Sequence, residues 1–279
     1  MRRAALVVAA TRCQTRQMRT EPIDKWVRAY VGDVAVVDTR TPLLFWEDDF
    51  PVPTYAVDEA DVRTDLLQPT DPPPSAEWSS FDPQGPVSQW YDVVVGDQRR
   101  PHAAWRLADP AVAYRLVLSW RPGLLDRWTE EDEEVMGHPK DPYHRVEVLR
   151  SSRHVVVRRD GVLLADSRRP VLLYETGLPT RFYLPPEDVV ADALVSQENR
   201  THCPYKGFAE RYWGLREHPE VSGIAWCYDE PKAAVEAIAG RVAFYNELVD
   251  LEVDDLPLPR ARSPFSEDRP RVTGRAVHD

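Results

Sequence analysis

A six-residue segment, 202–207, carries the side chains with the most reactive chemistry in this chain. Its cysteine, Cys203, can act as a nucleophile when its thiolate is favoured, and neighbouring cations favour the thiolate. His202 and Lys206 are cations within four positions, and a histidine pKa near neutrality also suits acid/base work. Lys206 could instead hold a carboxylate or phosphate, with Gly207 letting the backbone approach. The candidate catalytic residues are therefore Cys203, Lys206 and His202.

Each of these residues also has an ordinary structural explanation. Free cysteine is among the most buried residue types, so Cys203 could pack as a small apolar side chain. Lys206 could close a salt bridge. His202 adjoins Cys203, and successive side chains of an extended segment point apart, which makes this histidine a poor partner for the thiol. The sequence leaves open whether the protein is an enzyme.

The chain contains one pattern twice, and only the later copy has the reactive segment. Residues 26–67 run parallel to residues 154–194. The residues that recur 128 positions later, as Asp38 recurs at Asp166, are Asp38, Arg40, Pro42, Glu47, Pro51 and Tyr55. Farther along the offset falls to 121, where Trp105 matches Trp226. So long a period indicates two complete domains, because solenoid repeats are typically about 20 to 50 residues.

We therefore expect five regions. They are a disordered leader at 1–20, an N-terminal module at 21–136, a junction at 137–150, a C-terminal module at 151–255 and a disordered tail at 256–279. In place of the reactive segment the N-terminal module has a proline run that begins at Pro72, and no Cys, His or Lys lies between this run and Trp90. We expect this degenerate copy to pack against the other module, covering an edge or roofing a pocket. Translation could begin at Met18.

Each module is expected to be mainly β (α+β), built from antiparallel strands with short helices. Asp160-Gly161 between two β-branched runs predicts a hairpin, and Gly32-Asp33 predicts its equivalent in the first copy. Further strands are expected over 171–174, 181–184, 224–228, 242–245 and 248–253, the last two as a pair around Asn246-Glu247. Short helices are expected over 185–194 and 231–239.

Composition argues against several classes of partner. The formal net charge of −11 repels phosphate backbones and anionic lipid, so neither nucleic acid nor a membrane is expected. No apolar run approaches the length of a bilayer-spanning helix. The cysteines Cys13, Cys203 and Cys227 form no CxxC pair, which favours reduced thiols in the cytoplasm. A metal site built from Cys203, Cys227 and His202 is the weakest hypothesis, because structural zinc usually shows two close ligand pairs; no cofactor is expected.

A second group of residues is expected to line a pocket in the C-terminal module. Arg168 and Glu175 have counterparts in both copies, so their shared role is expected to be structural, as a partly buried ion pair or hydrogen-bond anchor. Aromatic side chains combine apolar area with a polar edge, although Trp226 is expected in the core because Trp105 persists in the first copy. The candidate ligand-binding residues are Tyr205, Gly207, Tyr183, Arg168, Glu175, Trp213 and Tyr228.

Several stretches resemble a known bacterial family. The family called domain of unknown function 427 has segments similar to DSRRPVLLYETGLPTRFYLPPEDV, HCPYKG and IAGRVAFYNELVD, and its long, two-copy actinobacterial form has a junction similar to EDEEVMGHPKDPYHRVEVLRSSRHV. The resemblance covers about residues 18–255 and implies a compact β-tent fold, similar to small zinc-binding modules but without their paired cysteines. A nucleotidyltransferase label that accompanies the family is not adopted, because the chain has no Gly-Ser turn followed by paired carboxylates to hold metal and triphosphate.

The function expected from the sequence is binding of a small polar or anionic metabolite in the C-terminal module. Cys203 and Lys206 would then be available for covalent or acid/base catalysis. The alternative is a non-catalytic interaction or scaffold protein in which HCPYKG forms a rigid turn. A metal-binding module is the third alternative.

Overall fold

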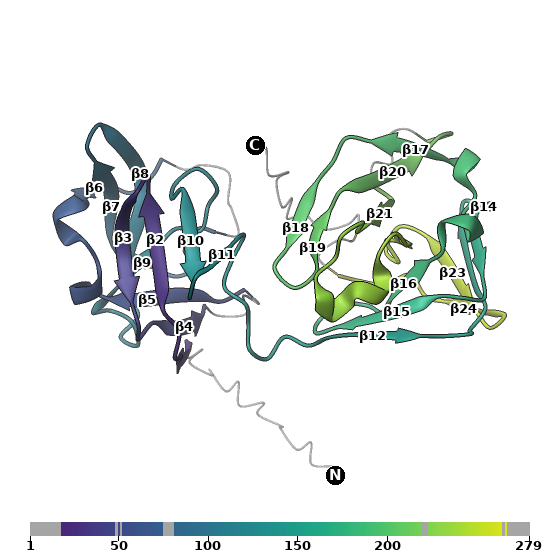
Figure 1. Ribbon diagram of the computed structural model, residues 1–279, viewed down its shortest axis with the longest axis horizontal. Helices are drawn as coiled ribbons and strands as arrows, with labels where there is room; N and C mark the ends of the chain where they lie inside the picture. Colours follow the sequence, from purple (N-terminus) through teal and green to yellow (C-terminus); the bar gives the residue numbers. More distant parts are fainter. Residues whose placement is uncertain are drawn as a thin grey trace, which may run out of the picture.

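The computed structural model describes residues 18–47, 50, 52–74, 81–218, 223–263 and 266 of the 279-residue chain. They form two modules joined by an extended junction, and each module has one seven-stranded and one four-stranded antiparallel sheet (Figure 1). The mainly β fold predicted from the sequence is thus confirmed. The expected leader and tail lie largely outside the described residues. Within those residues no helix has the length and apolar character needed to cross a membrane.

The N-terminal module has a large sheet of order β1-β4-β5-β9-β8-β7-β6 and a small sheet of order β11-β10-β2-β3. The large sheet comprises β1 (Arg19–Pro22), β4 (Leu43–Trp46), β5 (Thr54–Asp58), β6 (Leu67–Thr70), β7 (Val87–Val95), β8 (Gln98–Leu107) and β9 (Arg115–Leu118). The small sheet comprises β2 (Val27–Val31), β3 (Val34–Thr39), β10 (Arg127–Glu130) and β11 (Glu133–Val135). Two 3-10 turns, η1 (Glu59–Asp61) and η2 (Thr64–Leu66), precede β6.

The C-terminal module repeats this topology strand for strand and adds one hairpin. Its large sheet, in the order β12-β15-β16-β22-β21-β20-β17, comprises β12 (Val146–Arg150), β15 (Val171–Glu175), β16 (Arg181–Leu184), β17 (Leu194–Gln197), β20 (Arg211–Leu215), β21 (Ala225–Cys227) and β22 (Val242–Phe244). Its small sheet comprises β13 (Val155–Arg159), β14 (Val162–Ser167), β23 (Asp250–Val253) and β24 (Leu256–Leu258). The additional hairpin is β18 (Thr201–Cys203) with β19 (Gly207–Ala209). Strands therefore also occupy parts of the ranges expected for the junction and the tail.

Two local expectations are wrong. The helices expected over 185–194 and 231–239 are the 3-10 turns η3 (Pro186–Asp188), η4 (Ala191–Ala193) and η5 (Ala233–Ile238). Extended backbone at Val189, which bridges to Ala165, separates the first two turns. The last two strands also do not pair, because β22 lies in the large sheet and β23 in the small one. The segment between them crosses the module and carries a buried glutamate, Glu247.

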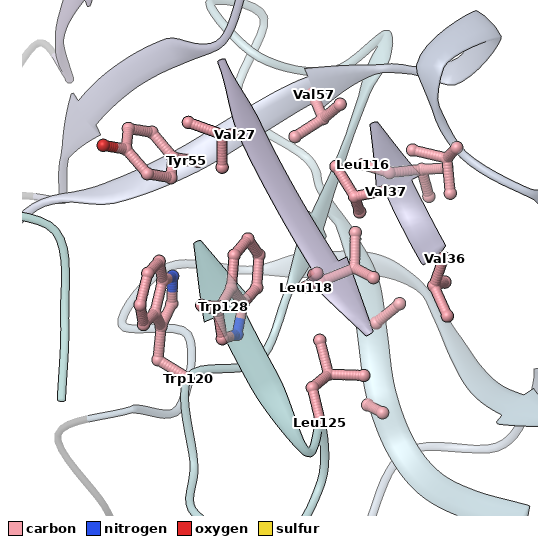
Figure 2. Packing of buried hydrophobic residues seen from close by; sticks show 14 of the residues in the cluster. Val27, Val36, Val37, Tyr55, Val57, Leu116, Leu118, Trp120, Leu125 and Trp128 are labelled. Atoms are coloured by element: carbon pink, nitrogen blue, oxygen red, sulfur yellow. The ribbon is translucent and has the colours of Figure 1, made fainter. Parts of the chain in front are cut away.

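Apolar side chains fill the space between the two sheets of each module. In the N-terminal module this core includes Val27, Val57 and Leu118, and Trp120 stacks on Trp128 with ring centroids 4.2 Å apart (Figure 2). Side chains alternate along a strand, so each large sheet also has an outer face. The outer cluster of the C-terminal module, which η5 partly covers, consists of Val171, Leu173, Tyr183, Ala209, Tyr212, Trp226, Tyr228, Val235, Ile238 and Ala243.

One pair of identical residues in the sequence repeat, Tyr55 and Tyr183, does not occupy equivalent positions in the structure. Leu43 lies opposite Ala56, whereas Val171, its counterpart 128 positions later, lies opposite Tyr183. The turn between β4 and β5 is therefore one residue longer than that between β15 and β16. The expected equivalence of Tyr55 and Tyr183 is wrong: Tyr55 points into the core between the sheets, and Tyr183 points into the outer cluster.

A buried ion pair joins β16 to the segment that follows β22. Arg181 is 3% exposed and Glu247 5% exposed, and Arg181 donates from Nη1 to Oε2 at 2.6 Å and from Nη2 to Oε1 at 2.8 Å. Burial alone would raise the pKa of Glu247, but the hydrogen bonds and charge of Arg181 outweigh it and lower the pKa below the usual 4.5. The pair is specific to this module, because Thr54 takes the place of Arg181 in the other.

We predict that Arg181→Met lowers the free energy of unfolding by about 3–5 kcal/mol, because it leaves a buried carboxylate without its cation. The double variant Arg181→Met, Glu247→Met should recover most of this loss. Because the folded-state pKa of Glu247 is lowered, the pair stabilises fully above about pH 4.5 and its contribution is lost as the pH falls further. Urea unfolding at pH 7 and pH 4 measures both effects. A single variant as stable as the wild type would contradict this account.

Candidate functional site

The reactive segment forms the tight turn of the β18–β19 hairpin. Cys203 lies opposite Gly207, and the backbone N–H of Lys206 donates to the carbonyl of Cys203 at 3.2 Å. The Lys206 carbonyl in turn accepts from the backbone N–H of Lys232 at 2.9 Å. Gly207 has a φ of +97°, and a Cβ there would lie 3.5 Å from the carbonyl oxygen of Glu230. Glycine is needed here for its left-handed conformation, which side chains rarely adopt.

The amine of Lys206 is paired inside the module. Its Nζ lies 2.5 Å from Oε2 of Glu175, and Lys206 is only 8% exposed. Oε1 of Glu175 lies 3.1 Å from Nε2 of His144, a junction residue whose ring stacks on that of Tyr205 at 4.2 Å. Burial alone would raise the pKa of Glu175, but the His144 hydrogen bond and the Lys206 charge lower it. Lys206 therefore closes a salt bridge, as the structural alternative expected.

Tyrosine hydroxyls surround the other side of the hairpin. Tyr183 is fully buried and its oxygen accepts from Nε1 of Trp226 at 3.2 Å, while the hydroxyl of Tyr212 lies 2.6 Å from that of Thr201. Burial is the main cause of the raised pKa of each tyrosine, about 12 for Tyr205. The charge of a Cys203 thiolate is a further cause for Tyr183, Tyr205, Tyr212 and Tyr228. These four phenols therefore stay protonated at neutral pH.

His202 does not supply the cation that the sequence analysis expected beside Cys203. The pKa of the His202 imidazole is lowered to about 4. Burial is the largest cause, and the charges of Lys232 and His138 lower the pKa further. The imidazole is neutral at pH 7, and its ring packs against Phe208 with centroids 4.7 Å apart. Its role as an acid or base stays a prediction.

Two of the expected site residues lie elsewhere. Arg168 is exposed in the turn after β14, and the ion pair expected between it and Glu175 does not form, because Glu175 binds Lys206 and His144. Trp213 packs against the core between the sheets. Its neighbour Tyr212 occupies the outer cluster instead, opposite Trp226. The structure thus brings together Cys203, Lys206, His202, Tyr205, Gly207, Tyr183, Glu175 and Tyr228, and leaves Arg168 and Trp213 outside.

Sequence reasoning missed His144, Tyr212 and Lys232. The alternation of side chains along β20 puts Tyr212 on the outer face of the sheet. This alternation can be used only once the bounds of the strand are known. Lys232 donates from Nζ to the carbonyl of Pro204 at 2.8 Å. Its pKa is lowered, mainly by burial and then by the like charge of Lys140, while a Cys203 thiolate would raise it. Lys232 is therefore a cation held at the HCPYKG turn, and nothing in its local sequence marked it.

In the N-terminal module the equivalent glutamate, Glu47, binds the backbone of its own loop. Oε2 of Glu47 accepts the backbone N–H groups of Gln84 at 2.9 Å and Gly85 at 2.6 Å. A Cβ at position 85 would lie 3.2 Å from this oxygen, so glycine allows the close approach. Gln84-Gly85 takes the place of Lys206-Gly207, because the backbone of the first dipeptide and the Lys206 side chain of the second contact equivalent glutamates. The counterpart of the reactive hairpin is thus the segment around Gln84 rather than the proline run that begins at Pro72.

Both modules match one family profile, over residues 19–129 and 147–255, and the profile is described as a domain of unknown function, DUF427. The chain belongs to the DUF427 family. It contains two tandem copies of the domain, as the resemblance implied, and the matched ranges cover more than half of its length. No curated protein matches the chain at a significant level. The family assignment therefore identifies the fold unit without assigning a reaction to it.

Metal ligands do not gather in the DUF427 copies. Among the residues that the structure describes, no three His, Cys, Asp or Glu side chains are placed to hold a metal ion. Cys203, Cys227 and His202 therefore do not form the site that was the third alternative. Cys227 is fully buried, and burial is the main cause of a thiol pKa raised to about 11.

The Lys206–Glu175 pair gives a test of the buried charge. We predict that Glu175→Gln lowers the free energy of unfolding by about 3 kcal/mol, because it leaves the Lys206 ammonium buried and unpaired. The double variant Glu175→Gln, Lys206→Met removes both charges and should recover most of this loss. Urea unfolding at pH 7 compares them. Equal losses would show that Lys206 finds another partner in the single variant.

Proposed function

We propose that the C-terminal DUF427 copy binds a small polar or anionic molecule at the β18–β19 hairpin, with Cys203 as its reactive group. The observation that carries this proposal is the half-buried Cys203 on the hairpin turn, where the Lys232 amine donates to the carbonyl of the next residue, Pro204, at 2.8 Å. Access and a cation held at the same turn are features that support a nucleophilic thiol. Cys227, by contrast, is fully buried, and burial raises the pKa of its thiol to about 11.

The anion would be bound by Lys232 and Lys140 rather than by Lys206. Lys206 is neutralised by Glu175, whereas Lys232 and Lys140 are both exposed and repel each other enough to contribute to the lowered pKa of Lys232. A carboxylate or phosphate between the two amines would relieve this repulsion. Only part of the Lys232 hydrogen-bonding capacity is used by the Pro204 carbonyl, since an ammonium has three donors.

Covalent catalysis is the second part of the proposal. The Cys203 thiol would lose its proton to solvent and its sulfur would bond to an electrophilic carbon of the ligand. The electron pair displaced from that carbon would come to rest on an oxygen of the ligand. Protonated phenols such as Tyr205 can donate hydrogen bonds to that oxygen, as donors do in an oxyanion hole. Neutral His202 is in the form that a general base requires, although a pKa of about 4 makes it a weak one.

A non-catalytic scaffold is the second candidate, and the contacts of the junction favour it. The Tyr205 hydroxyl accepts the backbone N–H of Asp141 at 2.7 Å, and Oδ2 of the same Asp141 accepts Nε1 of Trp46 at 3.2 Å. The hairpin and the N-terminal module are thereby joined through one residue. On this view the HCPYKG turn positions the junction, and intramolecular packing of the modules is its purpose.

Three finer assignments belong to the same proposal. We place the chain in the two-copy actinobacterial form of the family on the resemblance of its junction. We assign its architecture to the β-tent type on the resemblance of its modules. We assign it to the cytoplasm, which the free thiols of Cys203 and Cys227 support.

Alkylation rates distinguish a reactive thiol from a structural one. In a Cys13→Ser background at pH 7.5, we predict that iodoacetamide modifies Cys203 about a hundredfold faster than Cys227, since burial and a raised pKa suppress the second thiolate. Peptide mass spectrometry gives both rates. Equally slow modification of the folded protein would favour the scaffold. Native mass spectrometry of the purified protein then shows whether a small molecule is retained.

The charge of the alkylating reagent tests the role of Lys232. Iodoacetate and iodoacetamide attack the same thiol, but only iodoacetate is an anion. We predict that Lys232→Gln lowers the ratio of the iodoacetate rate to the iodoacetamide rate several-fold, whereas Arg63→Gln, which removes an exposed cation of the other module, leaves it unchanged. Added salt should reduce the wild-type ratio in the same direction. A ratio that does not respond to Lys232 would contradict binding of an anion there.

A further inference from the structure

Gly137, at the start of the junction, lies against the HCPYKG turn. Its φ is +88°, a left-handed conformation that suits glycine, and a Cβ built on it would lie 3.6 Å from Nδ1 of His202 and 3.7 Å from Cγ of Pro204. The junction backbone therefore packs on this nitrogen of the histidine ring. Nδ1 is buried from solvent and, in the part of the chain that the structure describes, has no hydrogen-bond partner.

Protonation of His202 would conflict with this contact. A neutral imidazole can leave Nδ1 without a hydrogen, whereas an imidazolium carries a hydrogen on both nitrogens. The hydrogen on Nδ1 would then have no acceptor, and a buried donor without an acceptor is unfavourable. Movement of Gly137 away from the ring would give Nδ1 access to water and so remove the conflict.

The charges around the imidazole act in the same direction. Burial is the largest cause of the lowered pKa of His202, and the charges of Lys232, His138 and Arg200 lower it further. These three groups come from three different parts of the chain: the loop before η5, the junction and the residues before β18. A second positive charge on the turn would be repelled from all three sides when His138 is also protonated.

The other two histidines of the junction are less suited to this role. His144 already has a carboxylate partner, Glu175, at 3.1 Å. His138 lies at a small space that Glu47 and Asp82 also line, although burial still lowers its pKa. A proton on either ring would thus have a negative charge in its surroundings. His202 is the histidine of this region on which the described charges are cationic.

Release of the junction from the turn would affect both modules, because Asp141 contacts each of them. Its backbone N–H donates to the Tyr205 hydroxyl of the turn at 2.7 Å, and its Oδ2 accepts from Nε1 of Trp46 in the N-terminal module at 3.2 Å. Asp141 lies only four residues after Gly137. A change at Gly137 is therefore transmitted along a short, extended segment to the contact between the modules.

We propose that the contact between Gly137 and His202 is an acid-sensitive latch, which holds the junction on the HCPYKG turn at neutral pH and releases it when His202 takes up a proton. The latch does not depend on whether Cys203 is reactive. The pKa of His202 is about 4 with the latch closed and returns toward the usual 6.5 when the ring reaches water. The contact is therefore fully stable above pH 6.5 and weakens as the pH falls from there toward 4.

Hydrogen exchange measured by mass spectrometry on the full chain tests the latch. The reporter is the segment 137–145, in which the N–H groups of Asp141 and His144 are hydrogen-bonded. Comparison with the unfolded chain at the same pH removes the pH dependence of exchange itself. We expect the protection of this segment to be about tenfold lower at pH 5 than at pH 7.5. The paired strands β15 and β16 should keep their protection, because the pKa values of Glu175 and Glu247 are lowered and both carboxylates stay ionised at pH 5.

Two histidine variants separate the latch from a general effect of acid. His202→Phe keeps a ring beside Phe208 but takes up no proton, so its protection at pH 5 should equal that at pH 7.5. His102→Asn removes a histidine that contacts Trp90 in the N-terminal module, and it should keep the wild-type response. If His202→Phe does not fold, Lys232→Gln replaces it. This variant removes a charge that lowers the pKa of His202 and should therefore make the loss of protection at pH 5 smaller.

The proposal is overturned if wild-type protection of the segment 137–145 is the same at both pH values. It is also overturned if His202→Phe, or Lys232→Gln in its place, shows the full wild-type loss. An equal loss of protection in β15 and β16 would show that acid unfolds the whole C-terminal copy, and this result too would overturn the latch.

Discussion

The structure depends most on a buried glutamate at the end of one strand of each large sheet, Glu47 after β4 and Glu175 in β15. A carboxylate removed from water must be compensated by hydrogen bonds or opposite charge. Each copy satisfies this requirement with the loop that crosses the glutamate, so the glutamate fixes where that loop runs. In one copy the compensation includes two backbone N–H groups, of Gln84 and Gly85, and in the other it includes the Lys206 amine and His144. The same constraint therefore has two chemical solutions.

The two solutions lead to different surroundings. A lysine side chain that reaches the carboxylate occupies volume, and in the C-terminal copy Tyr183 and Tyr228 fill part of the outer cluster on the same sheet. Backbone compensation needs no side chain, and with Leu107 in the place of a tyrosine the N-terminal copy retains a cavity beside Glu47. The two copies thus differ in their packing beside this glutamate as well as in the side chains of the turn.

Much of the fold could be predicted from the sequence, because repeated spacing and Asp-Gly turns are local signals. The hairpin at Asp160-Gly161 and the paired strands β15 and β16 are confirmed. The equivalence of Tyr55 with Tyr183 was wrong because an inserted residue is invisible when identical letters happen to realign, whereas strand pairing reveals it. For a related reason Tyr212, rather than the predicted Trp213, lies in the outer cluster, because adjacent residues of a strand face opposite sides. No local signal linked Lys232 to the turn, because only the folded chain brings them together.

The candidate site includes residues of the junction, which lie outside both matched family domains. His144 and Asp141 both lie before the range 147–255 that matches the family, yet they contact Glu175 and Tyr205 within it. Tyr143, between them in sequence, donates its hydroxyl to Glu21 of the first copy, and the guanidinium of Arg19 lies over its ring. The segment is therefore bound on both sides. Because its contacts to the C-terminal copy include the partner of the buried glutamate, the position of the first copy and the charge balance of the second are physically linked through a few residues that neither copy contains.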